Sequence, residues 1–511
     1  MPRALISVWD KEGVEELARG LAELGWELVS SGGTAAYLEE QGLEVTHVED
    51  VTGAPEMLGG RVKTLHPRIH AGILARRDLD EDVAALAEQE IEPIDLVCVN
   101  LYPFSSVAGR HDKSVDEIVE MIDVGGPSML RAAAKNYAHT AAVSSPVQYG
   151  RVLAELREHG AVTAETRRVL ARDAFATSAA YEAAIANWFS SGEAFPQQLT
   201  LTFRKVADLP YGENPHQEAA FYVEPRARRH ILSRVEQLSG RELSFNNLAD
   251  LEGARRVMRE LEEPAAVIIK HANPCGVAVA PTIEEAWQRA LAADPVSAFG
   301  CVALLNRPVS GELGRQIAEH FVEVLVAPGF EDEAVEALQK RQALRILVDT
   351  ERRRETPGER DFKRVLGGML LQDRDLAGPR RDEMRVVCGD PTEEQWADLV
   401  FAWEICKHVS SNAIVIAKGG QTIGIGAGQM SRVDAVRIAV ENARIHKHDL
   451  AGAVLASDAF FPFPDGPEIA LEAGVTALIQ PGGSRRDQEV IDAVREGGAV
   501  MVFTRRRHFR H

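Results

Sequence analysis

The sequence predicts a protein of the α/β class, in which helices cover sheets of mainly parallel strands. Three observations lead to this prediction. Short apolar runs of strand length alternate with amphipathic helical patterns, glycine-rich turns follow several of these runs, and apolar and charged residues make up 45% and 26% of the chain. Such a composition is typical of proteins that bury a hydrophobic core.

The first residues already show the alternation. An apolar run at residues 4–8 predicts a strand, and the segment 14–24 carries its apolar residues on one helical face. Residues 26–29 predict a second strand, which leads through the glycine-rich turn 30–34 into a short helix at 35–41. Strand, turn and helix therefore follow one another as expected of a parallel sheet.

The periodicity breaks near residue 195, where several turn residues gather. We expect one domain at residues 1–195 and a larger one at 196–511, with an internal seam in the charged stretch near 350–365. The larger part alternates strand-like runs with helical segments, and the clearest runs are residues 265–269, 301–305, 344–348 and 453–456. No short tandem repeat is visible in it.

Charge and cysteine content exclude several classes of protein. With 57 Lys and Arg against 77 Asp and Glu, the net charge of −20 argues against a nucleic-acid binder, which needs a basic face. No apolar stretch has the length of a signal peptide or of a membrane span. The five cysteines are odd in number and form no Cys-x-x-Cys pair, which favours a reducing, cytoplasmic setting.

Two stretches of the N-terminal part suit an anionic ligand. Ser30-Ser-Gly-Gly-Thr34 stands where a strand meets a helix start, which favours phosphate binding, although an ordinary glycine turn would have the same sequence. Gly60-Arg-Val-Lys-Thr-Leu-His-Pro67 has too few apolar positions for a core element, and its cations suit an anion or a developing oxyanion. His66 and His70 lie four residues apart, but Pro67 and the missing glutamate disfavour a metal site.

Two further N-terminal motifs bring polar groups to strand or helix ends. Tyr102 follows an apolar strand, at the edge where open α/β sheets bind ligands, and packing is the alternative role for its ring. Asp123 precedes a Gly-Gly-Pro turn and a helix that ends with Lys135. A carboxylate, a helix start and an ammonium group can converge at such a turn.

In the larger part, Lys270 and His271 follow the apolar run 265–269 directly. Lysine and histidine at a strand end can exchange protons with a nucleophilic amine or a leaving group near neutral pH. The pair Pro274-Cys275 resembles part of the zinc-deaminase signature, but Ala278 replaces the second cysteine that such a site needs. A zinc site of that type is therefore disfavoured.

A glycine-rich segment at residues 410–432 predicts a hairpin that leads into a helix, with Asn412 and Arg432 at its two ends. These side chains suit amide or phosphate contacts, while a purely structural hairpin remains the alternative. The stretch from Asp458 to Phe463 adds a carboxylate beside three aromatic rings, which suits a flat ligand and equally a core.

Together these motifs resemble the bifunctional family that joins 5-aminoimidazole-4-carboxamide ribonucleotide (AICAR) formyltransferase to inosine monophosphate (IMP) cyclohydrolase. The resemblance runs from Ser7-Val-Trp-Asp-Lys11 to the C-terminus and includes Tyr211-Gly-Glu-Asn-Pro-His-Gln217 and Asp294-Pro-Val-Ser-Ala-Phe-Gly300. It implies an N-terminal methylglyoxal-synthase-like domain that closes the purine ring. The larger part would transfer formyl and consist of two cytidine-deaminase-like subdomains without zinc.

The resemblance also implies ligands and partners. The co-substrate would be 10-formyltetrahydrofolate, catalysis would need no metal, and a structural alkali cation would be compatible with the family. The chain would form a homodimer, with transformylase sites at the subunit interface, and would bind neither nucleic acid nor membranes.

The resemblance assigns catalytic roles in both reactions. In formyl transfer, His271 would take the proton of the attacking amine, Lys270 would stabilise the oxyanion or help the folate nitrogen to leave, and Asn412 would position substrate. In ring closure, Lys63 and Tyr102 would act on the oxyanion and on the departing hydroxyl. Asp123 with Lys135 would handle the transfer of the amide proton. The expected substrate-binding residues are Ser7, Lys11, Ser30, Ser31, Gly33, Thr34, Arg61, Tyr211, His216, Gly300, Arg432, Asp458, Phe463 and Arg507.

Two other interpretations compete with a bifunctional enzyme. In the first, only one half is active, and the N-terminal domain is a sugar-phosphate lyase or an effector-binding module. In the second, the chain is a non-catalytic regulator that binds nucleotide or folate. The combination of Lys63, Tyr102, Asp123 and Lys135 disfavours the first, and the Lys270-His271 pair disfavours the second.

Overall fold

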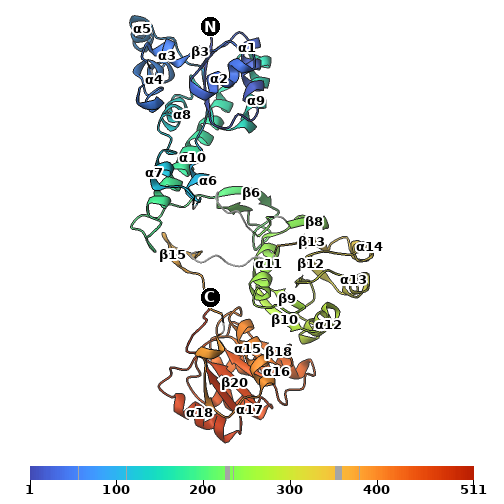
Figure 1. The fold of residues 1–511 in the computed structure, drawn as a ribbon. Helices are drawn as coiled ribbons and strands as arrows, with labels where there is room; N and C mark the ends of the chain where they lie inside the picture. The colour runs from blue at the N-terminus through green and yellow to red at the C-terminus, as the bar shows by residue number, and fades with distance from the viewer. Residues whose placement is uncertain (56, 111, 225–230, 234, 352–358, 379) are drawn as a thin grey trace. The chain divides into compact units, whose positions relative to one another are not determined.

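The computed structural model of the chain describes residues 1–511 except 56, 111, 225–230, 234, 352–358 and 379 (Figure 1). Its contacts divide the chain into two compact units. Residues 1–204 make up the first unit, and nearly all of residues 205–511 make up the second. Each unit contains its own sheets and its own hydrophobic core.

The first unit is built on one five-stranded sheet with the strand order β3-β2-β1-β4-β5. All four neighbouring pairs are parallel, as the alternating sequence pattern predicted. The strands are β1 (Arg3–Val8), β2 (Glu27–Ser30), β3 (Thr46–His47), β4 (Leu96–Asn100) and β5 (Ala141–Val143). The α-helices are α1 (Val14–Glu23), α2 (Gly32–Glu40), α3 (Val48–Thr52), α4 (Pro67–Leu74), α5 (Asp80–Glu88), α6 (Phe104–Ala108), α7 (Val115–Val119), α8 (Gly125–Lys135), α9 (Tyr149–His159) and α10 (Ala164–Phe189).

Helices cover both faces of this sheet because successive strand residues point to opposite sides. In β1, Ala4 and Ile6 belong to the cluster formed with α1 and α9, whereas Leu5 belongs to the cluster formed with α4 and α8. The sheet is therefore buried on both faces, and its polar ligand-binding groups can stand only at its edges and strand ends.

The second unit contains two six-stranded sheets. The first sheet has the order β10-β9-β11-β12-β13-β8 and is built from β8 (Val235–Ser239), β9 (Ala265–Lys270), β10 (Asn273–Val279), β11 (Cys301–Leu305), β12 (Val322–Ala327) and β13 (Arg345–Asp349). Its helices are α11 (Phe245–Met258), α12 (Ile283–Ala293), α13 (Gly311–Ala318) and α14 (Asp332–Gln339).

The second sheet has the order β18-β17-β19-β20-β21-β16. Its strands are β16 (Arg385–Cys388), β17 (Ile414–Ala417), β18 (Thr422–Gly426), β19 (Val454–Ser457), β20 (Ala477–Gln480) and β21 (Val500–Phe503). Its helices are α15 (Glu393–Cys406), α16 (Arg432–Ile445), α17 (Asp465–Glu472) and α18 (Asp487–Glu496). Helices and strands follow the same order as in the first sheet.

The two sheets are copies of one topology. In both, an antiparallel hairpin is followed by an antiparallel pair, two parallel pairs and a final antiparallel pair. Helices α11 and α15 lie in a shared core between the sheets, while α12–α14 and α16–α18 cover the two outer faces. We call these halves the first and the second copy. Figure 1 draws them in green to yellow and in orange to red.

Short elements complete the second unit. Strands β6 (Arg204–Leu209) and β7 (Ala219–Val223) form one two-stranded sheet, and β14 (Arg360–Val365) and β15 (Gly368–Asp373) form another between the two copies in sequence. The seam expected at 350–365 falls partly on this second hairpin, and its residues 352–358 lie outside the described part of the chain.

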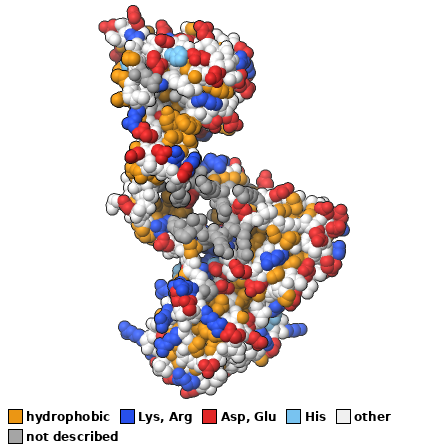
Figure 2. Space-filling model, viewed as in Figure 1, with side chains coloured by type: hydrophobic (Ala, Val, Ile, Leu, Met, Phe, Trp, Pro, Cys, Tyr) orange, Lys and Arg blue, Asp and Glu red, His pale blue; other side chains and the backbone are white. Residues whose placement is uncertain are grey.

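The surface agrees with the net charge of −20. Figure 2 shows acidic side chains distributed over the visible face of both units, interspersed with basic ones. Within the described residues, no helix combines the length and the apolar character that a membrane crossing requires. The same residues contain no group of three or more His, Cys, Asp or Glu side chains arranged to hold a metal ion.

Candidate active sites

The candidate site of the first unit lies at the carboxyl ends of its parallel strands. Lys11 follows β1, Ser31 follows β2, and Tyr102 follows β4. The strand order reverses direction between β1 and β4, and ligands of open α/β sheets bind at such a point. The fold thus brings together motifs that are 90 residues apart in the sequence.

Three of the expected catalytic groups meet at this edge. Burial raises the pKa of Tyr102, the negative charge of Asp123 adds to the rise, and the positive charge of Lys63 opposes it. The ammonium of Lys63 also reaches the start of α2, where a Cβ added to Gly32 would lie 3.3 Å from its Nζ. A phenol, a carboxyl and an ammonium group therefore act on one another beside a helix N-terminus.

Asp123 is held in place by its backbone surroundings. Its Oδ1 accepts a 2.9 Å hydrogen bond from the N–H of Gly126, and its own N–H donates to the hydroxyl of Tyr181 at 2.8 Å. Burial raises the pKa of the Asp123 carboxyl, and the bond from Gly126 opposes this rise. The result is a fixed carboxylate that is more basic than an ordinary aspartate.

The hydroxyls of the glycine-rich turn do not all face a ligand, which corrects part of the expectation. Ser30 is fully buried, and its hydroxyl donates to the carbonyl of Ile6 at 2.7 Å. Thr34 is buried too; its hydroxyl donates to the carbonyl of Val8 at 2.9 Å and accepts from Lys11 at 3.1 Å. Both hydroxyls join β1 to the turn and are not available to hold phosphate.

The remaining residues of the turn, Ser31 and Gly33, stand at the N-terminus of α2. Gly33 is exposed, and Ser31 is the N-cap without a side-chain capping bond. The ammonium of Lys11 also donates to the carbonyl of Val8, while Ser7 is half-buried within β1. Backbone N–H groups and the helix dipole are therefore the features of this turn that suit an anion.

Two expected residues stand apart from these three groups in the sequence of elements. Lys135 is the last residue of α8, whereas Asp123 precedes the start of that helix. Their expected joint action on one proton stays a prediction. Arg61 is exposed and forms an ion pair with Glu120, which satisfies its charge on the protein surface.

The candidate site of the second unit is built on the first copy, at the end of β9. The ammonium of Lys270 donates to the carbonyl oxygens of Phe299 and Gly300, at 2.9 and 2.7 Å. Lys270 and His271 line a cavity of about 240 Å³, to which Asp294 of the first copy and Asn442 of the second copy also contribute. Two of the three ammonium protons are thus bonded to protein, and one remains for a ligand.

Asn412 belongs to a buried polar network of the second copy. Its Oδ1 accepts from Arg432 at 2.7 Å, and Arg432 also donates to Ser457 at 2.7 Å and to Asp458. Arg432 is 8% exposed and Asp458 is fully buried. Their charges pair with each other, and Arg432 orients Asn412. The expected contacts of Arg432 and Asp458 with substrate stay predictions.

Hydrogen bonds join the Asn412 segment to the Lys270 segment. Asn273, two residues after His271, accepts from the backbone N–H of Ser410 at 2.8 Å. Arg510 donates to the carbonyl of Ala272 at 2.9 Å, and its backbone N–H donates to Ser411 at 3.1 Å. Residues from both copies therefore form one site.

Comparison with known proteins finds two family models along the chain. Residues 13–128 match the family model of the MGS-like domain, and residues 133–442 match that of the AICARFT/IMPCHase bienzyme. The chain belongs to the AICARFT/IMPCHase bienzyme family. This confirms the family, the fold class and the two activities expected from the motifs: formyl transfer to AICAR and ring closure to IMP, the last two steps of de novo purine synthesis.

Similarity to the curated bienzymes extends over the whole chain. The chain is 48% identical over 512 residues to the bifunctional purine biosynthesis protein PurH of Halalkalibacterium halodurans, with 100% of this chain and 99% of the relative covered. It is 49% identical over 527 residues to the protein of the same name from Magnetococcus marinus, with the same coverage.

Four other expected binding residues are not among those that line the Lys270 cavity. Tyr211 and His216 are exposed in the loop between β6 and β7 and do not line that cavity. Phe463 is 47% exposed and has the guanidinium of Arg486 4.8 Å above its ring centre. Arg507 is exposed and lies over the ring of Phe509.

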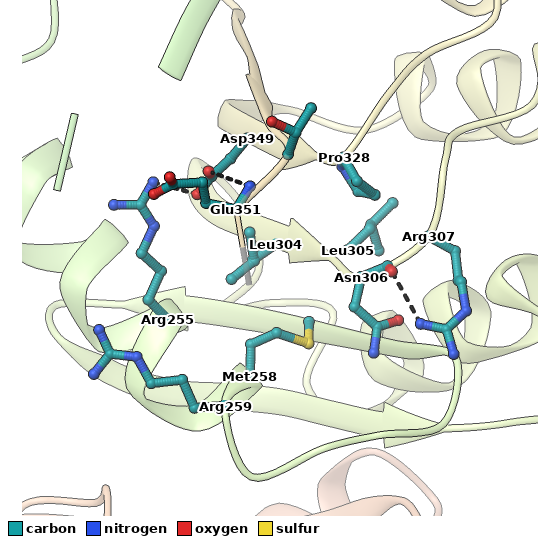
Figure 3. Close-up of a pocket in the computed structure, with 11 residues that line it drawn as sticks. Arg255, Met258, Arg259, Leu304, Leu305, Asn306, Arg307, Pro328, Asp349 and Glu351 are labelled. Atoms are coloured by element: carbon teal, nitrogen blue, oxygen red, sulfur yellow. Dashed lines mark hydrogen bonds and ion pairs between the residues drawn. The ribbon is translucent and has the colours of Figure 1, made fainter. Parts of the chain in front are cut away.

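A second cavity of the first copy, about 130 Å³ in volume, lies beside α11 (Figure 3). Arg255 forms an ion pair with Asp349 at 2.5 Å, and Arg307 donates to the carbonyl of Asn306 at 3.0 Å. Its arginines are thus bonded to the protein itself, and none of the motifs of the bienzyme reaches it.

Sequence reasoning missed three groups that shape the two sites. Asn100 accepts from the backbone N–H groups of Trp9 and Asp10, at 2.6 and 3.0 Å, and so fixes the loop after β1. Asp250 accepts from the N–H of Ala272 at 2.6 Å, and Arg510 donates to the carbonyl of the same residue. Asn100 stands in a motif that pointed to Tyr102, but Asp250 and Arg510 lie far from their partners in sequence.

Proposed function

We propose that the first unit closes the purine ring and that the second unit transfers the formyl group, each at the site described above. The observation that carries the proposal is the separate convergence of two catalytic sets. Lys63, Tyr102 and Asp123 meet in the first unit, while Lys270 and His271 share one cavity in the second.

In formyl transfer, the 5-amino group of AICAR attacks the formyl carbon of 10-formyltetrahydrofolate. His271 accepts the proton that the amine loses, directly or through the neighbouring carboxamide. Lys270 donates its remaining N–H to the oxyanion of the tetrahedral intermediate or to the departing folate nitrogen. The carbonyls of Phe299 and Gly300 support this role, because they hold the ammonium in place before substrate binds.

Asn412 positions the substrate or the migrating formyl group. Its amide is oriented by Arg432 through Oδ1 and by the carbonyl of Gln429, which accepts from Nδ2 at 2.9 Å. A side chain fixed at both ends loses little conformational freedom when substrate binds, and this favours a positioning role.

In ring closure, the carboxamide nitrogen attacks the formyl carbonyl of the same molecule, and water then leaves. Asp123 accepts the amide proton, and its raised pKa makes it a better base than an ordinary carboxylate. Lys63 stabilises the oxyanion, and Tyr102 protonates the departing hydroxyl. The N-terminus of α2, with Ser31 and Gly33, holds the nucleotide phosphate.

We further infer a cytoplasmic homodimer that uses 10-formyltetrahydrofolate as co-substrate and needs no metal for catalysis, a structural alkali cation being compatible with the family. The cytoplasmic setting is supported by the five cysteines, all of which are free thiols. The dimer and its shared transformylase sites rest on the family resemblance.

The test is a time course with AICAR and 10-formyltetrahydrofolate, in which the formylated intermediate and IMP are resolved by chromatography. Lys63→Ala should accumulate the intermediate, and Lys270→Ala should form none, yet should still cyclise intermediate that is added directly. Lys418→Ala is the matched control, because Lys418 occupies the place of Lys270 in the second copy. Unchanged ring closure in Lys63→Ala, or unchanged formyl transfer in Lys270→Ala, would reject the corresponding assignment.

A further inference from the structure

The turn that carries His271 has an unusual backbone. His271 and Ala272, the two residues between β9 and β10, have φ angles of +51° and +58°. Two-residue hairpin turns often need positive φ at both positions and therefore favour glycine or asparagine. A side chain with a Cβ disfavours this conformation by about 5- to 30-fold per residue. The turn therefore needs support from its surroundings.

The second copy contains the same turn with the expected residues. Between β17 and β18, Gly419 and Gly420 have φ angles of +58° and +72°. The preceding Lys418 donates to the carbonyl of Ala451 at 2.7 Å, as Lys270 does to that of Gly300. The duplicated fold thus offers an internal comparison, in which glycine relieves the strain and no imidazole is present.

One carboxylate supports each turn. In the second copy, Asp398 on α15 accepts from the N–H groups of Gly419 and Gly420, both at 2.7 Å. In the first copy, Asp250 on α11 accepts from the N–H of Ala272 at 2.6 Å and also from that of His271. A carboxylate at the same helix position therefore caps an unstrained glycine turn in the second copy and a strained turn in the first copy.

The first turn has additional support from the end of the chain. Arg510 donates to the carbonyl of Ala272 at 2.9 Å and to that of His408 at 2.5 Å. It crosses from the second copy to the first, and its backbone is fixed by Ser411. Asp250 therefore holds the N–H side of the turn, and Arg510 holds its carbonyl side.

We propose that Asp250 and Arg510 are positioning residues for formyl transfer, which together keep His271 in the left-handed turn that directs its imidazole into the Lys270 cavity. The inference rests on the proposed role of His271 as proton acceptor. If the turn relaxed to negative φ, the Cα–Cβ bond of His271 would change direction and the imidazole would leave the cavity. Both residues would then affect turnover without touching substrate.

The experiment compares Asp250→Asn with the matched control Asp398→Asn in the full-length chain. Each change replaces one carboxylate oxygen by an amide nitrogen, which cannot accept a hydrogen bond from the turn. We expect Asp250→Asn to lower kcat of formyl transfer at least tenfold with little change in KM for the nucleotide, and Asp398→Asn to lower it less than twofold. Ring closure of added intermediate should stay unchanged in both and reports that the chain is folded.

Two further variants separate positioning from a loss of charge or of fold. Arg510→Met removes the donor to Ala272 and should also lower kcat about tenfold. Adding Ala272→Gly to Asp250→Asn should raise kcat about fivefold above that of Asp250→Asn alone, because glycine adopts positive φ without a Cβ penalty. Equal losses in Asp250→Asn and Asp398→Asn, or no recovery with Ala272→Gly, would overturn the proposal.

His271→Ala distinguishes failure of the proposal from failure of the assigned catalytic role. Full formyl transfer in His271→Ala would reject His271 as proton acceptor, and with it any role in positioning it. If His271→Ala is inactive while Arg510→Met and Asp250→Asn keep full activity, the role of His271 stands and the positioning proposal falls.

Discussion

Lys270 donates a 2.7 Å hydrogen bond to the carbonyl oxygen of Gly300, and a Cβ added to Gly300 would lie 3.0 Å from the same ammonium nitrogen. The added carbon would also lie 3.1 Å from the ring of Phe321. Gly300 has a φ of +71°, which other residues adopt at a cost of about 1–2 kcal/mol. The absence of a side chain at Gly300 thus helps to place the ammonium of Lys270.

We expect Gly300→Ala to lower kcat of formyl transfer about tenfold or more, because the new methyl group pushes the Lys270 ammonium or the Phe321 ring aside. Steady-state kinetics with AICAR and 10-formyltetrahydrofolate measure the effect. Gly452→Ala is the control, since Gly452 has a φ of +80° but nothing within 4 Å of an added Cβ. If both variants lose the same activity, backbone strain explains the loss and the steric argument fails.

Ring closure should depend on pH through Asp123 and Tyr102. The pKa of Asp123 is raised above its ordinary value of 3.8, mainly by burial, so the rate should fall as the pH drops through that raised value. The pKa of Tyr102 is raised above 10.0, so the phenol should keep its proton, and its activity, through pH 10. A pH–rate profile with added formylated intermediate measures the acidic fall assigned to Asp123 and the alkaline fall assigned to Tyr102.

Tyr102→Phe is the control for the alkaline limb. It should lower kcat of ring closure by about 10²-fold, the usual size of general acid catalysis, and remove the alkaline fall that Tyr102 causes. An alkaline fall that begins below pH 9 in the wild-type protein, or one that persists unchanged in Tyr102→Phe, would assign the limb to another group.

The sequence predicts the strands and much of the chemistry because both follow local patterns. The runs at 4–8, 265–269 and 301–305 became β1, β9 and β11 within one residue at either end. Lys270 was placed at a strand end because an apolar run precedes it directly. The spacing of apolar residues indicates which face of a strand or helix is buried, and short motifs indicate which polar groups lie at a turn.

The sequence does not predict contacts that depend on tertiary structure. Asp250 and Asp398 lie within α11 and α15, and only the folded structure reveals that each caps a turn more than 20 residues away. The repeat of the two copies does not show as a short sequence period, and only the family resemblance implied two subdomains. The direction of Ser30 was misjudged because burial of a turn hydroxyl depends on the neighbouring strand.

The two copies also meet at the wall of the Lys270 cavity. Oδ1 of Asp294 lies 3.1 Å from Nε2 of His446, and Asp294 accepts from the N–H of Ser297 at 2.8 Å. The pair fixes the loop whose end bonds Lys270. We expect His446→Leu to lower kcat of formyl transfer about three- to tenfold, since the largely buried carboxylate of Asp294 loses one of its hydrogen-bond partners.

His446→Gln is the conservative control, because its amide can still donate to Asp294 and should retain most of the activity. Ring closure should be the same in both variants. If His446→Gln loses as much formyl transfer as His446→Leu, the loss reflects packing between the copies and not the bond to Asp294.

Glu404 should make the second unit less stable as the pH rises. Burial raises its pKa from 4.5 to about 8, and the negative charges of Glu260 and Glu263 add to the rise. Between pH 4.5 and 8 the unfolded chain ionises Glu404 while the folded chain keeps it protonated, so this group lowers the free energy of unfolding by up to about 1.4 kcal/mol per pH unit.

Glu404→Gln should therefore match the wild-type chain near pH 4.5 and be more stable at pH 8.5, as urea unfolding followed by tryptophan fluorescence can measure. The neutral amide keeps the shape of the protonated acid and removes only the charge that burial disfavours. Glu394→Gln, an exposed change on the same helix, should give no comparable gain at pH 8.5. A stability difference between Glu404→Gln and the wild-type chain that does not vary with pH would show that Glu404 is ordinarily ionised in the folded protein.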